Sequence, residues 1–238
     1  MTSKSNELPA GGGDAREWEL AVSRSALRAA SGQPDDWYSR GGKRVLDIVG
    51  TLIIFATFLP IIVVVACLMG LQGGNVMFWH ERVGRKGRFF RCYKFRSMVP
   101  DAERRLEQLL ASDPQARAEW DATRKLEDDP RITFLGRFLR RTSLDELPQL
   151  WNVLRGDMSL VGPRPVTQEE LARYGASVAA YLSIRPGLTG PWQVSGRNDI
   201  SYDERVRMDC DYAANYSLSR DLQVLWRTVW VVAVPNGK

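Results

Sequence analysis

The feature that most constrains this chain of 238 residues is a long uncharged stretch, which runs from Ile48 to Leu71 over 24 positions. A straight helix of that length, at about 1.5 Å per residue, would reach across the hydrocarbon core of a bilayer. Pro60 stands at its middle, where a proline breaks or kinks a helix. The competing interpretation is a helix buried in a soluble core, which so long a stretch disfavours.

The flanks of this stretch are basic on both sides. Cationic residues precede it and follow it: Arg28, Arg40, Lys43 and Arg44 before, then Arg82, Arg85, Lys86 and Arg88 after. The positive-inside rule orients a membrane crossing through a difference in charge between its two ends, and here the two ends are alike. We therefore predict a re-entrant helical hairpin that turns at Leu59-Pro60, with both ends on the cytoplasmic face.

The composition limits the chemistry that the chain can carry out. Its net charge of +5 and its pI of about 9.3 suit anionic partners: a nucleotide, a lipid phosphate or a membrane surface. Its three cysteines, at unrelated spacings, indicate neither a disulfide framework nor a zinc site, so we expect the chemistry to face a reducing cytosol. The single histidine, His80, excludes histidine-rich metal sites, and the sequence has neither a P-loop nor a dinucleotide-binding glycine motif.

Two adjacent carboxylates, Asp145 and Glu146, precede an apolar helical run in the segment from Arg140 to Pro165. Ser143 has the capping-box spacing to Glu146, whereas Pro148 fits better as the first residue of a helix that starts there. In either register the pair lies at a helix N-terminus, where we expect both carboxylates to be ionised. They could then hold a metal or attack an electrophile; a helix cap without chemistry is the competing interpretation.

The neighbourhood of the pair favours chemistry over a simple cap. Arg140 and Arg141 precede it, and a rigid turn, Gly162-Pro163-Arg164-Pro165, follows. Pro165 restricts Arg164 to extended conformations, so this arginine loses little entropy when its two-pronged guanidinium binds a phosphate. Carboxylates, arginines and a rigid turn in one short segment indicate phosphate chemistry with a divalent metal.

This segment resembles the signature of the bacterial sugar transferases, the monotopic phosphoglycosyl transferases that load polyprenyl phosphate with a sugar phosphate. The likeness covers residues 43 to about 234, and within the family the chain most resembles the enzymes that prime exopolysaccharide repeat units with a hexose phosphate. Further motifs match in order: KRVLD at 43–47, FWHERVGRKGRFFRCYKFRSM at 78–98, DDPRITFLGRFLRRTSLDELPQL at 128–150 and RPGLTGPWQVSGRN at 185–198.

The resemblance leads to one specific hypothesis for the reaction. Asp145 would attack the sugar-bearing phosphate of a UDP-sugar, releasing UMP and leaving a covalent aspartyl–phosphosugar intermediate. Polyprenyl (undecaprenyl) phosphate, delivered along the membrane hairpin, would then take the sugar phosphate. Glu146, with Asp145 beside it, would hold Mg²⁺, which typically takes one or two protein carboxylates together with substrate phosphates. The family's membrane turn usually carries Ser before the Pro, where this chain has Leu59 before Pro60.

Candidate substrate-binding residues are basic or polar side chains within the matching motifs. Lys94 and Arg96 stand at alternate positions of an extended segment and hence on one face. The arginines around the dyad could meet the nucleotide phosphates, and a stiff Gly/Pro-rich loop at 185–197 could cradle the substrate. A solvated face and simple turns are the competing accounts. The complete set is Lys94, Arg96, Arg131, Arg140, Arg141, Arg164, Gln193 and Arg197.

We predict an α+β fold, mostly α, in three parts. Residues 1–42 form a polar tail with a weak amphipathic helix at 14–30, residues 43–75 form the re-entrant membrane helix, and residues 76–238 form a cytoplasmic catalytic domain. This domain should begin with a small β-hairpin and carry amphipathic helices, the last of which is typical of a helix in the membrane interface. The expected strands are 76–82 and 88–93, and the expected helices are 101–126 with a break near Asp113-Pro114, 132–141, 167–181, 202–216 and 222–230.

The predicted location is the bacterial inner membrane, with the catalytic domain facing the cytoplasm and the membrane lipids as partners. A homodimer is left open, and no residue identifies the sugar as glucose, galactose or an N-acetylated hexose. Two other classes of function compete with the enzyme: a membrane-anchored scaffold without chemistry, and a basic nucleic-acid-binding module. The second has the charge but lacks an aromatic-studded sheet or a recognition-helix pattern, so nucleic acid is not an expected partner.

Overall fold

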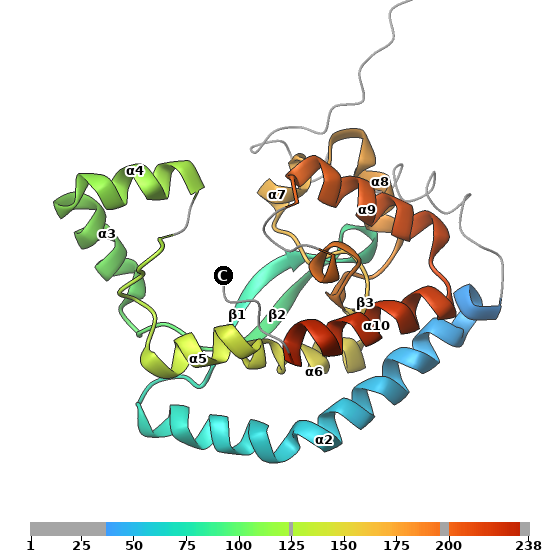
Figure 1. The fold of residues 1–238 in the computed structure, drawn as a ribbon, viewed down its shortest axis with the longest axis horizontal. Coiled ribbons are helices and arrows are strands. Elements are labelled where there is room, and N and C mark those ends of the chain that lie inside the picture. Colours follow the sequence, from blue (N-terminus) through green and yellow to red (C-terminus); the bar gives the residue numbers. More distant parts are fainter. Residues whose placement is uncertain (1–36, 124–125, 196–199, 234–238) are drawn as a thin grey trace, which may run out of the picture. The chain divides into compact units, whose positions relative to one another are not determined.

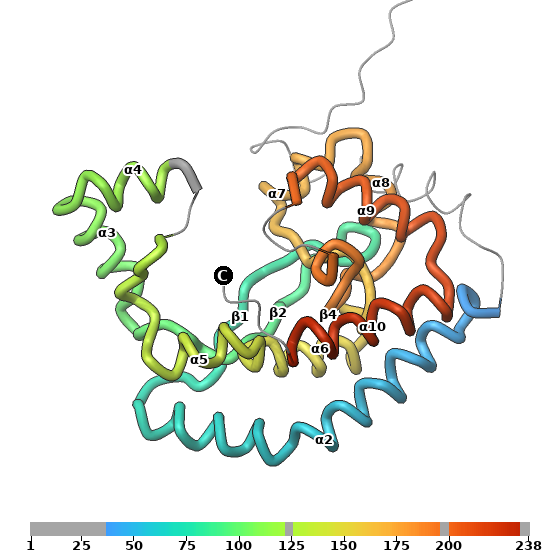
Figure 2. The backbone as a smooth tube through the Cα atoms, in the orientation of Figure 1, coloured from blue at the N-terminus to red at the C-terminus, as the bar shows by residue number. Residues whose placement is uncertain are grey.

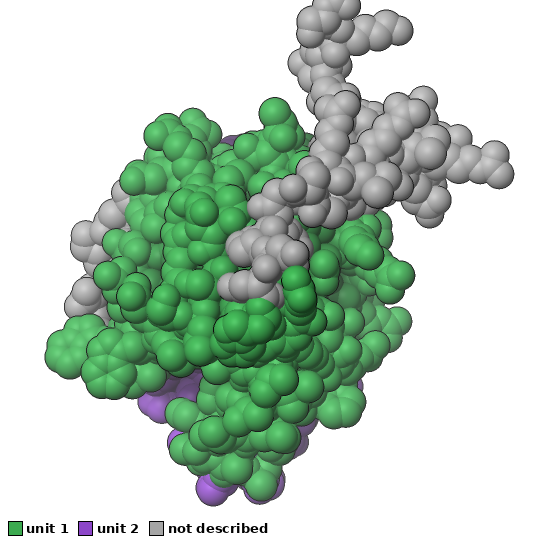
Figure 3. All heavy atoms as spheres, turned by 90° about the vertical axis from the view of Figure 1, so that its right-hand side faces the viewer, with its two compact units in different colours: residues 1–59, 79–93, 148–238 green, residues 60–78, 94–147 purple. Residues whose placement is uncertain are grey.

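The computed structural model describes residues 37–123, 126–195 and 200–233. The helix predicted at 14–30 and the candidate residue Arg197 lie outside these described residues. The chain clusters into two compact units, which Figure 3 distinguishes by colour. Unit 1 comprises residues 1–59, 79–93 and 148–238, and unit 2 comprises residues 60–78 and 94–147.

One long helix, α2, spans Lys43–Leu71 and follows a short π-helical turn at Tyr38–Gly42 (Figure 1). Pro60 lies inside it, so the turn predicted at Leu59-Pro60 is not confirmed: the helix continues through the proline. The φ of proline is compatible with a helix, but proline lacks the N–H donor and costs about 3 kcal/mol inside a helix. The many other hydrogen bonds of a long helix can offset this cost. In the described part of the chain, residues 38–71 make one helix that is long and apolar enough to cross a membrane, and an 18-residue window within it has a mean hydropathy of 3.0.

The predicted β-hairpin is confirmed. Strands β1 (Met77–Val83) and β2 (Phe89–Phe95) pair across a 3₁₀ turn at Arg85–Gly87. At the end of β1 the Val83 N–H donates to the carbonyl of Val166, and the Val83 carbonyl accepts a hydrogen bond from the buried Tyr181 hydroxyl. The hairpin is therefore tied to the helical part of unit 1.

Helices of unit 1 pack around the end of the hairpin and form a hydrophobic core with it. They are α7 (Gln168–Ala172), α8 (Val178–Ser183) and α9 (Tyr202–Asn215). Thr167 caps α7 in a reciprocal capping box with Glu170, so the helix predicted from residue 167 begins there. The helix predicted over 167–181 is interrupted, however, because Gly175 adopts a positive φ of 50° within a 3₁₀ turn. The buried cluster consists of Val83, Val166, Leu171, Tyr174, Val178, Tyr181, Leu182 and Val206.

Unit 1 also contains a second small sheet, which the sequence does not predict. Strands β3 (Ser159–Val161) and β4 (Gly187–Thr189) pair in parallel. Their backbones approach closely at Gly162 and Gly187, where a side chain would collide with the facing main chain. Because β3 leads directly into the turn that carries Arg164, this sheet fixes the start of that turn.

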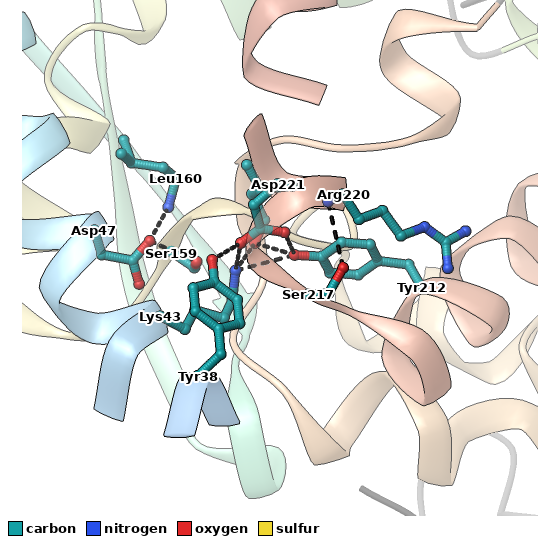
Figure 4. Close-up of polar contacts among 10 residues, drawn as sticks. Tyr38, Lys43, Asp47, Ser159, Leu160, Tyr212, Ser217, Arg220 and Asp221 are labelled. Carbon is teal, nitrogen blue, oxygen red and sulfur yellow. Dashed lines mark hydrogen bonds and ion pairs between the residues drawn. The ribbon is translucent and has the colours of Figure 1, made fainter. Parts of the chain in front are cut away.

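A buried polar cluster joins the start of α2 to helix α10 (Leu218–Ala233), as Figure 4 shows. Asp221 of α10 is fully buried and lies 2.6 Å from the Lys43 ammonium. The hydroxyls of Tyr38 and Tyr212 also donate hydrogen bonds to its carboxylate, each at 2.5 Å. A buried charge is tolerated when it is paired and hydrogen-bonded, and both conditions hold here.

The same end of α2 is tied to strand β3 (Figure 4). Asp47, which is 1% exposed, accepts hydrogen bonds from the Ser159 hydroxyl and the Leu160 N–H, both at 2.8 Å. Lys43 also donates to the Val161 carbonyl at 3.0 Å. Three successive residues of β3 therefore fix the register between this strand and α2.

Unit 2 is mainly helical, and the tube in Figure 2 follows its helices in chain order. They are α3 (Ala102–Ser112), α4 (Pro114–Thr123) and α5 (Phe134–Thr142), followed by a 3₁₀ turn, Leu144–Glu146. The predicted break at Asp113-Pro114 is confirmed; the Asp113 carboxylate accepts hydrogen bonds from the Gln115 and Ala116 N–H groups. The buried cluster of this unit consists of Val65, Met69, Phe95 and Leu139.

Candidate active site

The acidic dyad lies in the 3₁₀ turn between α5 and the following helix α6 (Gln149–Arg155). Ser143 ends α5 in the left-handed conformation, with φ 58°, and its side chain makes no cap hydrogen bond. The capping-box alternative is therefore wrong. The predicted start at Pro148 is confirmed to within one residue, because Pro148 precedes Gln149 in a helical conformation (φ −60°, ψ −20°) and its carbonyl accepts a hydrogen bond from the Trp151 N–H. Gly156 ends α6, with φ 88°, a conformation that favours glycine.

Asp145 is buried, at 8% exposure. Burial raises the pKa of its carboxyl to about 6; the charge of Glu146 adds to the rise, whereas Lys94 and Arg140 oppose it. A carboxyl with this pKa is still mostly ionised at neutral pH, as expected, but its pKa is raised because desolvation outweighs the favourable charges. Desolvation makes an ionised carboxylate a stronger nucleophile than one in water, and the charges of Lys94 and Arg140 favour the ionised form.

Lys94, at the end of β2, reaches the second member of the dyad. Its ammonium lies 2.6 Å from the Glu146 carboxylate, and the two side chains are 30% and 28% exposed. The sequence places these residues in different motifs, and the fold brings them together. Because both side chains are partly exposed, the Lys94 ammonium and the Glu146 carboxylate remain accessible to a ligand.

Arg140 lies in the last turn of α5 and is a second cation that acts on the dyad. Its Nε donates a hydrogen bond to the Ser97 hydroxyl at 2.8 Å, while the residue as a whole is exposed. Its charge acts on both Asp145 and Asp129. The guanidinium is thus anchored through one nitrogen and accessible to a phosphate through the others.

Arg131 is held differently from Arg140. Its Nε and Nη2 donate to the two carboxylate oxygens of Asp129 at 2.8 and 2.7 Å, and Trp120 lies under its guanidinium at 5.1 Å. Burial tends to raise the pKa of Asp129, but the hydrogen bonds from Arg131 outweigh it and the pKa is lowered. Both residues are buried, so the pair braces the turn before α5, and substrate binding by Arg131 stays a prediction.

Among the described residues, the remaining candidates make no hydrogen bond or ion pair with Asp145 or Glu146. In unit 2, Arg96 donates to the Gly73 carbonyl at 2.5 Å, and Arg141 is exposed. In unit 1, Arg164 is exposed, and Gln193 donates weakly to the Leu188 carbonyl at 3.4 Å. Their substrate-binding roles stay predictions.

The dyad fits Mg²⁺ only as a partial site. Among the described residues there is no group of three or more His, Cys, Asp or Glu side chains placed to hold a metal. Asp145 and Glu146 supply two adjacent carboxylates, and one Glu146 oxygen is already bonded to Lys94. Mg²⁺ commonly takes one or two carboxylates and completes its shell with water and substrate phosphates, so this donor set fits the ion when a diphosphate is bound.

Two residues near the dyad were not candidates from sequence reasoning: Ser97 and Asp129. Both lie in motifs that carry the family resemblance, and each holds an arginine of the site by a side-chain hydrogen bond. Ser97 has no spacing that marks its role, because its partner Arg140 lies 43 positions away. Asp129 lies two positions before Arg131, and this close spacing could have suggested the pair.

Comparison with known proteins shows which family the chain belongs to. The family model described as "Bacterial sugar transferase" matches residues 38–235. The chain is 54% identical over 199 residues to the UDP-galactose-lipid carrier transferase of Erwinia amylovora, and 52% identical over 199 residues to the undecaprenyl-phosphate galactose phosphotransferase of Salmonella typhimurium. These matches cover 84% of this chain but only 42% of each relative.

A shorter relative is matched over most of its length. The exopolysaccharide production protein ExoY of Sinorhizobium fredii is 45% identical over 196 residues, which cover 82% of this chain and 87% of ExoY. The matched region in every case includes the acidic dyad and the motifs around it, since it extends over four fifths of the chain. This chain belongs to the bacterial sugar transferase family.

Proposed function

We propose that this protein transfers a hexose 1-phosphate from a UDP-sugar to polyprenyl phosphate, releasing UMP, as the priming step of exopolysaccharide synthesis. The names of its relatives support the acceptor and the kind of group transferred, since two of them are called undecaprenyl-phosphate sugar phosphotransferases. The relative ExoY supports the pathway. These names favour an enzyme over a scaffold or a nucleic-acid-binding module.

The observation that carries the proposal is the buried carboxylate of Asp145 between cationic neighbours. In the first step an Asp145 oxygen attacks the phosphorus that bears the sugar. The bond from this phosphorus to the oxygen bridging the two phosphates breaks, and UMP leaves with that oxygen. The enzyme then carries an acyl phosphate ester of the sugar.

In the second step an oxygen of polyprenyl phosphate attacks the same phosphorus. The acyl–phosphate bond breaks, Asp145 is regenerated as a carboxylate, and the product is a polyprenyl diphosphate sugar. Both steps exchange one phosphorus–oxygen bond for another, so neither needs an oxidant or a net proton.

The charged neighbours of Asp145 have separate tasks. Arg140 faces the charge that develops on the transferred phosphoryl group, and Lys94 neutralises Glu146 before substrate binds. Mg²⁺, held by Glu146 and Asp145 together with the diphosphate, would supply further neutralisation of the phosphate oxygens.

We further propose that α2 enters the inner membrane from the cytoplasmic face and that α10 lies in the membrane interface. The basic flanks of α2 support the first point, because they favour the same side for both ends. A kink at Pro60, which lies inside the helix, would let it return to that side. Exposed aromatic side chains on α10 support the second: Trp226 is 75% exposed and Trp230 is 68% exposed. Tryptophan at the rim of an amphipathic helix is typical of that location.

The proposal is tested by UMP release from purified protein in detergent, with polyprenyl phosphate, Mg²⁺ and a panel of UDP-hexoses. Release that requires one UDP-sugar and yields a lipid-linked sugar supports the transferase. A scaffold or a nucleic-acid-binding module would release none with any donor. The same panel identifies the sugar.

A further inference from the structure

Ser97 contacts both ends of helix α5, although it lies outside that helix. Its carbonyl accepts a hydrogen bond from the N–H of Thr133, the N-cap residue of α5, at 3.1 Å. Its hydroxyl accepts the bond from Arg140, in the last turn of α5, at 2.8 Å. Ser97 is buried, at 8% exposure. One residue thus bridges the length of the helix that leads into the dyad.

The backbone of α5 is packed directly against Ser97. At Gly136, in the first turn of α5, a side chain would collide with the Ser97 carbonyl, so only glycine allows this approach. Met98 pairs with Ile132 in an isolated antiparallel bridge immediately next to this contact. The segment that carries Ser97 therefore fixes where α5 begins.

The chain from Arg140 to the dyad is a sequence of tight turns. The N–H of Ser143 donates to the Arg140 carbonyl at 3.3 Å, and the N–H of Glu146 donates to the Ser143 carbonyl at 3.2 Å. These hydrogen bonds fix the backbone between Arg140 and Asp145. The orientation of the Arg140 side chain relative to the dyad therefore depends on the contacts of its guanidinium.

Among the described residues, the Ser97 hydroxyl is the one side chain that bonds the Arg140 guanidinium, and no carboxylate lies within ion-pair distance of it. An exposed arginine side chain otherwise samples many rotamers. A neutral anchor at Nε orients the guanidinium without consuming its charge, which leaves the charge for a phosphate.

We propose that Ser97 is a positioning residue for the transfer reaction: it holds Arg140 in the orientation that stabilises the phosphoryl group transferred at Asp145. The inference rests on the proposed function for its catalytic meaning. The competing account is that Ser97 only stabilises the fold of unit 2, in which case Arg140 would work equally well without it.

A double-mutant cycle separates these accounts. The variants are Ser97→Ala, Arg140→Ala and the double variant, with Ser97→Thr as the hydroxyl-retaining control and Ser112→Ala as an exposed-serine control in the same unit. The expected loss for Ser97→Ala is about tenfold or more in kcat, with KM for the UDP-sugar nearly unchanged. In the Arg140→Ala background, removal of the Ser97 hydroxyl should cost nothing further. Ser112→Ala should match wild type, and Ser97→Thr should restore most of the activity.

Equal, additive losses in both backgrounds would overturn the inference while leaving the proposed function intact. If the wild-type protein releases no UMP with any UDP-sugar, the proposed function itself fails, and the inference fails with it.

A second readout does not depend on turnover. In protein labelled with ¹⁵N-arginine, the Arg140 Nε–H signal, assigned by its loss in Arg140→Lys, should exchange slowly with solvent in wild type and Ser97→Thr. In Ser97→Ala it should exchange at the rate of an exposed arginine. Unchanged exchange in Ser97→Ala would show that the hydroxyl does not hold Arg140, and would overturn the inference even if activity fell.

Discussion

The Lys94 ammonium lies 2.6 Å from the Glu146 carboxylate, so the end of strand β2 and the turn that carries the dyad meet at one ion pair. The two residues are 52 positions apart in the sequence. Because both side chains are about 30% exposed, the pair is screened by water and contributes little to stability, on the order of 1 kcal/mol or less. We therefore expect this ion pair to affect the rate of the reaction more than the stability of the fold, because it changes the net charge next to Asp145.

Replacement of Lys94 by Met should reduce activity far more than stability. We expect UMP release to fall at least tenfold, because Glu146 loses its cation and repels the diphosphate, while the melting temperature changes by only a few degrees. Arg117→Met is the matched control, since it removes a positive charge from exposed α4 in the same unit. A Lys94→Met variant with wild-type turnover would show that the ion pair has no part in the reaction.

The Lys43–Asp221 pair should behave in the opposite way. Asp221 is fully buried, so Lys43→Met leaves a carboxylate without its counter-charge and should destabilise the protein by about 3–5 kcal/mol. Asp221→Asn removes the charge and keeps one of the two oxygens that accept from the Tyr38 and Tyr212 hydroxyls, and the double variant should be more stable than Lys43→Met alone. Thermal unfolding in detergent measures all three. Equal destabilisation by Lys43→Met in both backgrounds would mean that the two residues are not coupled.

Asp209 should make stability depend on pH. Burial raises the pKa of its carboxyl from 3.8 to about 7, and the Tyr174 hydroxyl donates to it at 2.8 Å. The raised pKa means that the folded state binds the proton more tightly, so this contribution is fully present below pH 3.8 and is lost as pH rises through about 7. The loss is on the order of a few kcal/mol at about 1.4 kcal/mol per pKa unit.

Asp209→Asn tests this dependence, because the amide is neutral at every pH and keeps an oxygen for the Tyr174 hydroxyl. The variant should gain stability over wild type as pH rises from 5 towards about 8, measured as the difference in melting temperature. A difference that stays constant across this range would contradict the predicted titration.

The local structure of this protein could be predicted where a single segment decides it. The β-hairpin follows from aromatic and β-branched residues, mixed with bases, on both sides of a turn at Gly84 and Gly87. The break before α4 follows from Pro114, and the end of α6 follows from Gly156. The spacing of Thr167 and Glu170 likewise indicates their capping box. In each case residues within one turn of each other supply the whole signal.

The rest depends on contacts between distant segments. Strands β3 and β4 have three residues each and are separated by the 25 residues 162–186, so neither has a pattern of its own. Ser143 takes a positive φ without being glycine, which no local preference favours. The burial that raises the pKa of Asp145 comes from packing, whereas its sequence neighbours suggested only helix-terminus stabilisation.

The topology of α2 is tested by cysteine labelling at its two ends. Gly41 and Gln72 are suitable sites, because both are exposed and neither has a backbone conformation that strains a side chain. The background should carry Cys67→Ser, since the native Cys67 is exposed. We expect an impermeant thiol reagent to label neither site in intact spheroplasts and both after the membrane is opened. Labelling of one site from outside would mean that the helix crosses.

The central claim is that Asp145 becomes covalently attached to the sugar phosphate. Asp145→Asn should abolish turnover, because an amide is a far weaker nucleophile of similar size. Glu146→Gln should be severely impaired as well, but higher Mg²⁺ should recover part of its activity if its loss is one of metal binding. Turnover alone therefore does not distinguish a nucleophile from a metal ligand.

The most direct measurement uses UDP-sugar labelled in the sugar, with Mg²⁺ and without any lipid acceptor. Wild-type protein should release up to about one UMP per enzyme and retain the label on a peptide that contains residues 144–149, and Asp145→Asn should retain none. If wild type releases UMP only when polyprenyl phosphate is present, the acceptor attacks the donor directly, and the covalent mechanism is wrong.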